Sequence, residues 1–190
     1  AQPGAYIAVI GGGFIGCELA ASLASLGCKV SLLFPGELLG AGRYPDGLAR
    51  YLTDYYRDHG VDVRAGAQVT GSNPTDGGVE LSLSDGSLLR VEAAVAGIGV
   101  TPNVALAEQA GLAVDNGILV DAQLRSSDPD IWAAGDVANF HSVSLDRRMR
   151  VEHEDAAVGM GRLAGRAMAG VAEEYVTQPF FYSDLFDLGY

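Results

Sequence analysis

The chain is short of basic residues, cysteines and long apolar runs, and each shortage excludes a class of function. It has 12 Lys and Arg against 24 Asp and Glu, a formal net charge of −12. Because phosphates are neutralised by clustered cations, we expect neither nucleic acid nor an anionic membrane as a partner. No apolar run approaches the ~20 residues of a membrane span. We expect a cytoplasmic protein, or a mitochondrial one in a eukaryote.

The two cysteines, Cys17 and Cys28, do not form a C-x-x-C pair. We expect both to be small apolar packing residues, and neither a disulfide scaffold nor a metal site.

Glycine is abundant instead, with 26 of 190 residues, and three glycines form the most informative motif. Residues 6–20 combine an apolar strand, a G-x-G-x-x-G turn at Gly11, Gly13 and Gly16, and the start of a helix. In a dinucleotide site these glycines allow the tight turn, the approach of a pyrophosphate and close helix packing, respectively. The helix N-terminus adds free N–H groups and a positive dipole end. The alternative is a glycine-rich turn in another kind of α/β protein.

The first half of the chain predicts an α/β fold with a parallel sheet. We expect parallel strands at 5–10, 28–34 and 61–64, with helices at 14–26 and 45–59 between them. Shorter, alternating strands at 68–70, 79–83 and 88–91 predict an antiparallel meander. An apolar strand at 93–98 then returns to the parallel sheet. The whole is a Rossmann-like βαβαβ unit with a meander.

The end of the second strand bears on cofactor choice. Phe34 stands where the simplest fingerprint has an acid for a ribose diol, and Glu37 is the nearest carboxylate. No Arg lies at the strand end to bind a 2′-phosphate, which favours NAD over NADP. Arg43 is six residues beyond Glu37 and within reach of the same region.

The composition changes near Gly99, where we place a domain boundary. We expect a short helix at 103–109, strands at 118–121 and 131–136, and a helix at 156–168. The strand at 131–136 would place Asp136 at a carboxyl edge, where α/β ligands bind, although an N-cap or turn role is the alternative. The Arg147–Arg150 cluster predicts a solvated strand face or salt bridges. The aromatic tail at 179–186 should line a pocket or enter a core.

Taken together, these motifs resemble the pyridine nucleotide–disulfide oxidoreductase superfamily, in its apoptosis-inducing-factor and ferredoxin-reductase branch. The matching stretches occur in the family's order along nearly the entire chain. They are Gly-Gly-Gly-Phe-Ile-Gly-Cys-Glu-Leu-Ala at 11–20, Leu-Phe-Pro at 33–35, Gly-Val-Thr-Pro-Asn at 99–103, Ile-Trp-Ala-Ala-Gly-Asp at 131–136, Arg-Val-Glu-His at 150–153, Gly-Arg-Leu-Ala-Gly at 161–165 and Phe-Tyr-Ser-Asp-Leu at 181–185.

The resemblance implies two domains: an NAD(H)-binding domain at 1–98 and the later part of an FAD-binding domain at 99–190. The family's N-terminal FAD segment and its C-terminal interface domain are expected outside this chain. By similarity, cofactor contacts fall on the following residues: Gly11, Gly12, Gly13, Phe14, Ile15, Gly16, Glu18, Glu37, Arg43, Gly99, Asp136, Glu152, His153, Glu154 and Tyr182. Of these, Gly12–Ile15 would carry the pyrophosphate and Glu18 would lie toward the nicotinamide.

On the flavin side, Asp136 would hold the ribityl–phosphate region, and Glu152, His153 and Glu154 would lie between nicotinamide and flavin. Two departures from the family pattern concern the site. Gly36 is inserted before Glu37, which displaces Glu37 and Arg43 by one position. Tyr182 stands where relatives often have Trp. His153 lies among three acidic residues. We expect either that they raise its pKa or that it is an ordinary hydrogen-bonded histidine.

The implied activity is an NAD(P)H-dependent flavoprotein oxidoreductase that prefers NADH, with FAD as second cofactor and a ferredoxin or small molecule as acceptor. Because cofactors carry this chemistry, we assign no catalytic acid or base. With one dinucleotide turn where the family uses two, the chain alone should bind NAD(H), hold FAD weakly or not at all, and not turn over. The missing FAD segment is an expected partner, and a homodimer stays open. The rival is a non-catalytic dinucleotide-binding or interaction module of apoptosis-inducing-factor type. A stand-alone NAD dehydrogenase is the interpretation that the sequence supports least, because such an enzyme needs a catalytic base and His153 is the only plausible one.

Overall fold

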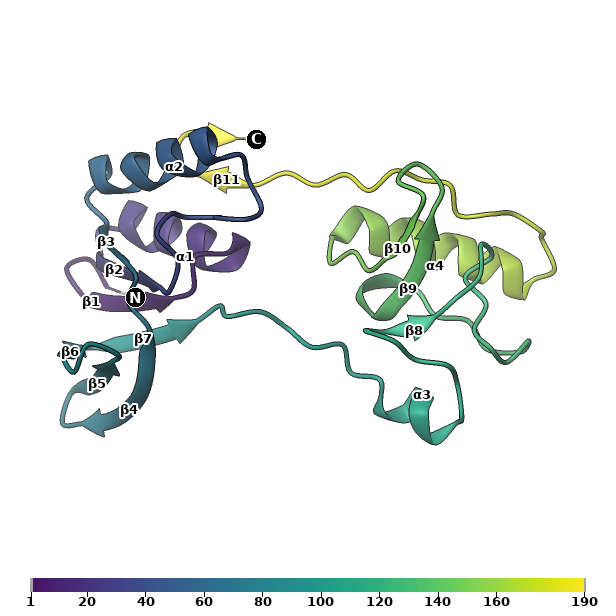
Figure 1. The fold of residues 1–190 in the computed structure, drawn as a ribbon, viewed down its shortest axis with the longest axis horizontal. Helices are drawn as coiled ribbons and strands as arrows, with labels where there is room; N and C mark the ends of the chain where they lie inside the picture. The colour runs from purple at the N-terminus through teal and green to yellow at the C-terminus, as the bar shows by residue number, and fades with distance from the viewer. Residues whose placement is uncertain (1, 190) are drawn as a thin grey trace. The chain divides into compact units, whose positions relative to one another are not determined.

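The computed structural model describes residues 2–189, which form two compact units (Figure 1). Unit 1 comprises residues 2–99 and 182–189, and unit 2 comprises residues 100–181. The sequence grouped residues 182–190 with the second half of the chain. Residues 182–189 instead pack on unit 1, because Leu185 enters its core.

Unit 1 is built on a four-stranded parallel sheet, which confirms the predicted Rossmann-like fold. The sheet order is β3-β2-β1-β7, with two helices in the connections. The elements are β1 (Tyr6–Ile10), α1 (Phe14–Ser25), β2 (Lys29–Phe34), α2 (Asp46–Asp58), β3 (Asp62–Ala65) and β7 (Ala93–Ala96). Gly27, with a φ of +82°, follows the end of α1 as expected for a glycine stop.

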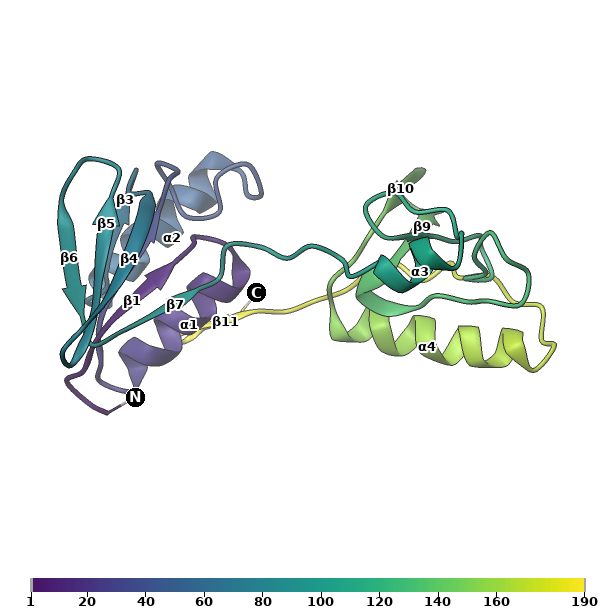
Figure 2. The ribbon, with the colours of Figure 1, turned by 90° about the horizontal axis from the view of Figure 1, so that it is seen from below.

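The sheet of unit 1 is covered on both faces. One face packs on α1 and α2, and the other on the antiparallel meander of β4 (Val69–Thr75), β5 (Gly78–Leu83) and β6 (Leu88–Val91) (Figure 2). Alternate residues of β1 divide between the two cores: Ile7 and Val9 face the helices, whereas Ala8 faces the meander. Burial on both faces explains why β1 and β2 read as continuous apolar runs.

Unit 2 has shorter elements. A three-stranded sheet of order β10-β9-β8 pairs β8 with β9 in parallel and β9 with β10 antiparallel, and packs on α4. The elements are α3 (Ala105–Gln109), β8 (Ile118–Leu119), the 3-10 turn η1 (Gly135–Val137), β9 (Ala138–Ser142), β10 (Arg147–Met149) and α4 (Glu154–Met168).

The predicted strand at 131–136 is wrong. Trp132 makes only an isolated bridge with Arg125, and Ala133 donates its amide to Leu124 at 3.0 Å. The chain then turns at Gly135, whose φ of +76° starts η1 and ends the extended run. Asp136 therefore lies in a turn, as the alternative interpretation had it, and its side chain is exposed. The strand that follows, β9, was not predicted.

The C-terminal residues of unit 1 form a short antiparallel hairpin, β11 (Asp184–Leu185) and β12 (Leu188–Gly189). Leu185 is buried, whereas Phe180 and Tyr182 are 63% and 70% exposed, so only part of the aromatic tail enters a core. Within residues 2–189, no helix combines the length and the apolar character that crossing a membrane would need.

Candidate dinucleotide-binding site

The glycine turn joins β1 to α1 at the carboxyl edge of the parallel sheet. Gly11 has a φ of +117°, a conformation that favours glycine, and its amide donates to Leu33 at 2.8 Å. A Cβ on Gly16 would lie 1.8 Å from the backbone oxygen of Gly11, so the helix can approach the turn only with glycine there. Both glycines have the roles that the motif predicted.

The start of α1 presents backbone donors to this edge. Gly12 uses its carbonyl to accept from the amide of Gly40 at 3.2 Å, which folds the loop after β2 against the turn. The amides of Gly12 and Gly13 donate to no group among residues 2–189. Together with the positive end of the helix dipole, free amides at a helix N-terminus form a site suited to an anion such as a diphosphate.

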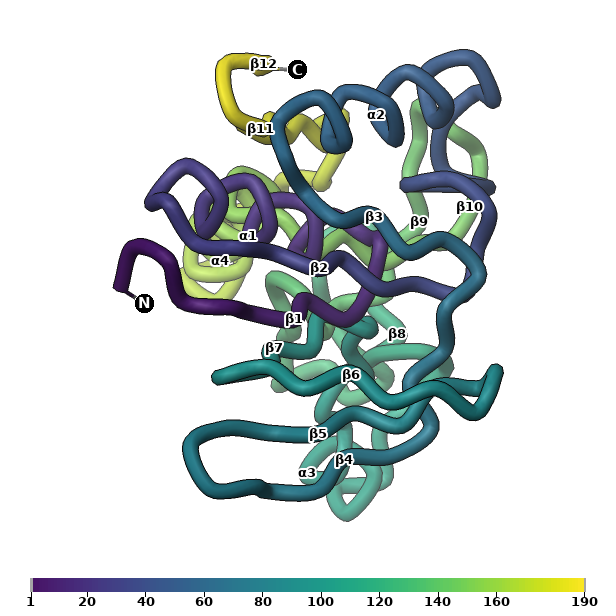
Figure 3. The backbone as a smooth tube through the Cα atoms, turned by 90° about the vertical axis from the view of Figure 1, so that its left-hand side faces the viewer, coloured from purple at the N-terminus to yellow at the C-terminus, as the bar shows by residue number. Residues whose placement is uncertain are grey.

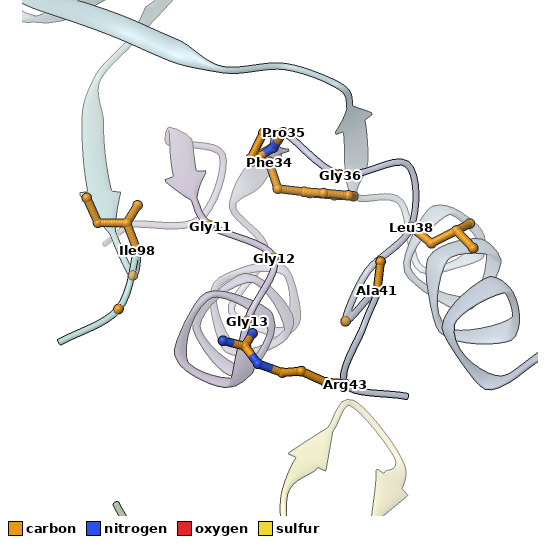
Figure 4. A pocket seen from close by; sticks show the side chains of 13 residues that line it. Gly11, Gly12, Gly13, Phe34, Pro35, Gly36, Leu38, Ala41, Arg43 and Ile98 are labelled. Atoms are coloured by element: carbon orange, nitrogen blue, oxygen red, sulfur yellow. The ribbon is translucent and has the colours of Figure 1, made fainter. Parts of the chain in front are cut away.

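A cavity of about 320 Å³ opens at this position (Figure 4). Its walls come from the glycine turn, the loop after β2 and the end of β7, and much of them is bare backbone. The lining residues are Gly11, Gly12, Gly13, Phe34, Pro35, Gly36, Leu38, Gly40, Ala41, Arg43, Gly97, Ile98 and Gly99. Glycine-rich walls let a ligand approach the main chain closely.

Phe34 and Arg43 are the two large side chains at the turn. A Cβ on Gly12 would lie 2.9 Å from the Phe34 ring, so this ring forms the wall at the end of β2. The guanidinium of Arg43 lies 5.7 Å from the centroid of the Phe14 ring and reaches toward Gly13, as Figure 4 shows. No carboxylate among residues 2–189 is within ion-pair distance of Arg43, so its charge is available to an anion.

Of the remaining predicted residues Ile15, Glu18, Glu37 and Gly99, only Gly99 lines the cavity. Glu37 is exposed between the lining residues Gly36 and Leu38 but does not itself line the cavity. Ile15 is 53% exposed on the first turn of α1. Glu18, one turn further along α1, accepts a hydrogen bond from Ser183 at 2.6 Å. Gly99 closes the lining with a φ of +105°.

In unit 2, Arg150 joins two of the predicted segments; its ion pair is one of the two outcomes expected for the arginine cluster, whereas its bond to Asp136 was not anticipated. Its Nη1 donates to the backbone oxygen of Asp136 at 2.7 Å, and its Nη2 lies 2.7 Å from Glu152 Oε1. The Arg150 side chain is only 10% exposed. Arg148 similarly donates to the carbonyls of Val120 and Asn139. Two of the three clustered arginines are therefore committed to internal contacts, which argues against a nucleic-acid surface.

His153 and Glu154 begin α4. His153 is its N-cap residue, with a ring stacked on Phe181 at 4.4 Å, and Glu154 lies exposed in the first turn. Glu154 and Asp155 place negative charge at the positive end of the α4 dipole, which stabilises the helix. The sequence signals for Arg150 were its place in the Arg147–Arg150 cluster and in the Arg-Val-Glu-His motif.

The two cysteines form no disulfide within residues 2–189. Both are free, and burial raises the pKa of the Cys17 thiol to about 11, which keeps it protonated at neutral pH. Among residues 2–189 no three His, Cys, Asp or Glu side chains are grouped as a metal site would need.

The family is decided by a match over residues 1–161 to the description "Pyridine nucleotide-disulphide oxidoreductase". This chain belongs to that family. The match includes the glycine turn, the cavity and the segment from Asp136 to Glu154. The family resemblance inferred from the motifs is therefore confirmed.

Several relatives are ferredoxin reductases. The chain is 35% identical over 184 residues to the ferredoxin–NAD(+) reductase component of the anthranilate 1,2-dioxygenase system of Burkholderia cepacia, covering 97% of the chain and 45% of the relative. It is 35% identical to putidaredoxin reductase of Pseudomonas putida, with 96% and 44% covered. Mitochondrial apoptosis-inducing factor 1 of Dictyostelium discoideum is 32% identical, with 96% and 36% covered. The chain thus spans less than half the length of these relatives.

The solved structures give the same assignment. The putidaredoxin reductase in its covalent complex with putidaredoxin superposes with a TM-score of 0.92 at 34% identity, over 99% of the chain and 46% of the relative. The ferredoxin reductase for the CYP199A2 system of Rhodopseudomonas palustris gives 0.89 at 36%, over 96% and 46%.

Proposed function

We propose that this chain is the NAD(H)-binding unit, with the later part of the FAD-binding unit, of an NAD(P)H-dependent flavoprotein oxidoreductase. The observation that carries the proposal is the cavity at the glycine turn. Within residues 2–189, the backbone amides of Gly12 and Gly13, at the N-terminus of α1, are free at this cavity. The guanidinium of Arg43, which has no carboxylate partner in the described part of the chain, lies beside them, and glycine backbone forms much of the wall. The positive charge and free amides suit the negative charge of a dinucleotide pyrophosphate, and the glycine-lined cavity leaves room for the pyrophosphate to approach the backbone.

The protein's part in such a reaction is to bind, orient and exclude water. NADH and FAD, when bound, supply the hydride donor and the hydride acceptor. Unit 1 would hold NADH by its pyrophosphate at Gly12–Ile15, with Glu18 toward the nicotinamide and Arg43 and Glu37 toward the adenosine side. Arg43 also lies near enough to Gly13 to share the pyrophosphate charge.

Unit 2 fits FAD only in part. Arg150 holds the turn of Asp136 and the carboxylate of Glu152 together, as one wall of a flavin site would require. However, unit 2 has no second G-x-G-x-x-G turn. The expectation that this chain alone binds NAD(H) but holds FAD weakly therefore remains a proposal, as do the flavin-side roles of His153, Glu154 and Tyr182.

We further propose a preference for NADH and a ferredoxin-type acceptor in the cytoplasm. The negative charge of Glu37, next to the lining residues Gly36 and Leu38, would offset the attraction of Arg43 for a 2′-phosphate, and no Arg lies at the end of β2. For the acceptor, the support is that the relatives are named as reductases of ferredoxins and of putidaredoxin.

Gly13→Ala tests the site. Gly13 has an extended backbone that alanine adopts without strain, and the added Cβ would meet only the mobile end of Arg43, 2.8 Å away. We expect a folded protein whose Kd for NADH, measured by fluorescence titration of the chain, rises about tenfold or more because a methyl group blocks the pyrophosphate.

Gly47→Ala is the matched control, since Gly47 lies in α2 with open space around it and should bind NADH normally. An unchanged Kd in Gly13→Ala, or no NADH binding by the wild-type chain, would refute the site. NADH-dependent ferricyanide reduction by a protein extended to the length of its relatives separates the enzyme from a non-catalytic module.

A further inference from the structure

Ser183 joins the C-terminal hairpin to α1. Its side chain is only 2% exposed, and its hydroxyl donates to Glu18 Oε1 at 2.6 Å, across 165 residues of sequence. A buried hydroxyl that lost this acceptor would be left without a hydrogen bond, which is unfavourable. The bond is therefore an integral part of unit 1, and it ends on a residue that the proposed site places toward the nicotinamide.

The hairpin that directly follows Ser183 is firmly docked on unit 1. Leu185 is 1% exposed and packs in the core beside α1 and α2. Figure 3 shows β11 and β12 lying along these two helices. Contacts within unit 1 thus fix where the chain re-enters it after unit 2, one residue before Ser183.

Phe186 and Asp187 secure the tip of the hairpin. The Phe186 ring stacks on His59 at 4.3 Å and meets the Tyr56 ring edge-on at 5.2 Å. The Tyr55 hydroxyl donates to the Asp187 carboxylate, and the backbone oxygen of Leu185 lies 3.2 Å from the same hydroxyl. Phe186 has a φ of +59°, and such a conformation in a bulky residue persists only where the surroundings hold it.

We propose that Ser183 is a positioning residue of the NAD site, acting through Glu18. The inference rests on the proposed function. By engaging one carboxylate oxygen, Ser183 fixes the side-chain rotamer of Glu18 and leaves the other oxygen to accept from a ligand. Because a carboxylate only accepts, the ligand group it selects is an N–H donor, and the carboxamide is the neutral donor of a nicotinamide. Ser183 thereby sets selectivity for the carboxamide.

The experiment compares NADH with reduced 3-acetylpyridine adenine dinucleotide, which has a methyl ketone in place of the carboxamide. For the wild-type chain we expect NADH to bind about tenfold more tightly than the analogue, and Ser183→Ala to lose most of this ratio. Ser183→Thr keeps the hydroxyl and should restore the ratio. Ser72→Ala, at an exposed position of β4, is the matched control and should behave as wild type.

Hydrogen exchange of the amides in residues 184–188 reports whether the hairpin stays docked. An unchanged ratio of the two affinities in Ser183→Ala, with the hairpin protected, would overturn the proposal. So would a lost ratio that Ser183→Thr does not restore, because hairpin docking alone would then explain the effect. Failure of the wild-type chain to bind either nucleotide would refute the proposed function instead, and the two failures are therefore distinguishable.

Discussion

The two units differ in how completely their buried polar side chains are hydrogen-bonded. In unit 1, Ser31 bonds to both Tyr6 and Asp62, and Thr53 donates to Ala49 while accepting from the amide of Leu39. Among residues 2–189, five buried side-chain nitrogen or oxygen atoms have no hydrogen-bond partner, and all five belong to unit 2. They are Arg125 Nε, Trp132 Nε1, Asn139 Oδ1, Arg150 Nε and Tyr175 Oη.

Each such atom costs about 1–3 kcal/mol unless a partner reaches it. Unit 1 pairs the buried hydroxyls of Ser31 and Thr53 with its own side-chain and backbone groups. Unit 2 leaves these five atoms without a hydrogen-bond partner among residues 2–189. The two units therefore differ in how completely their buried polar atoms are paired, and three substitutions test the stability of each unit separately.

The largest effect is expected at the glycine turn of unit 1. A Cβ in Gly16→Ala would lie 1.8 Å from a backbone oxygen that cannot move without shifting β1 or α1. We expect a loss of about 3 kcal/mol or more in the free energy of unfolding. The loss is measured by denaturing the protein and using hydrogen exchange of the β1 and β2 amides to detect the unfolding of unit 1. Trp132, the single tryptophan, lies in unit 2, and its fluorescence should be unchanged. An equal loss in both units would contradict their separate cores.

A smaller effect is expected in unit 2 from Arg150→Met. The substitution keeps the volume but removes the bond to the Asp136 carbonyl and the ion pair with Glu152. We expect unit 2 to lose about 2 kcal/mol, measured by the denaturation midpoint of Trp132 fluorescence. Arg147→Met, at an exposed position of β10, is the control and should change stability by less than about 0.5 kcal/mol. Equal effects of the two substitutions would show that Arg150 has no positioning role.

The smallest effect is expected at Ser31, and it depends on pH. Burial raises the pKa of Asp62, but hydrogen bonds from Ser31 and Arg64 lower it by more, so the folded pKa lies below its usual value. Asp62 therefore contributes stability above its unfolded pKa of about 3.9, which is lost as pH falls through the folded pKa. Ser31→Ala should cost about 1–2 kcal/mol at neutral pH and flatten this acid decline of unit 1. An unchanged decline in acid would exclude the Ser31 contribution.

The sequence by itself determined the regular part of unit 1 and the family. Apolar runs buried on both faces of a sheet, glycine stops and the G-x-G-x-x-G turn all act between residues close in sequence, so β1, α1, β2 and α2 were predicted within a few residues. The same apolar pattern predicted that the strand at 93–98 returns to the parallel sheet, and the structure shows that β7 does so beside β1.

Tertiary structure alone decided the contacts between distant segments. Residues 131–136 have the apolar composition of a strand, but a backbone bond from Ala133 to Leu124 and the turn at Gly135 end the extended run. The arginine cluster was expected to be a solvated strand face or to form salt bridges, and only the structure shows that Arg150 pairs with Glu152 and bonds to the Asp136 carbonyl. The bond from Ser183 to Glu18 joins residues 165 positions apart, and no local pattern reveals it because it depends on where the chain returns after unit 2.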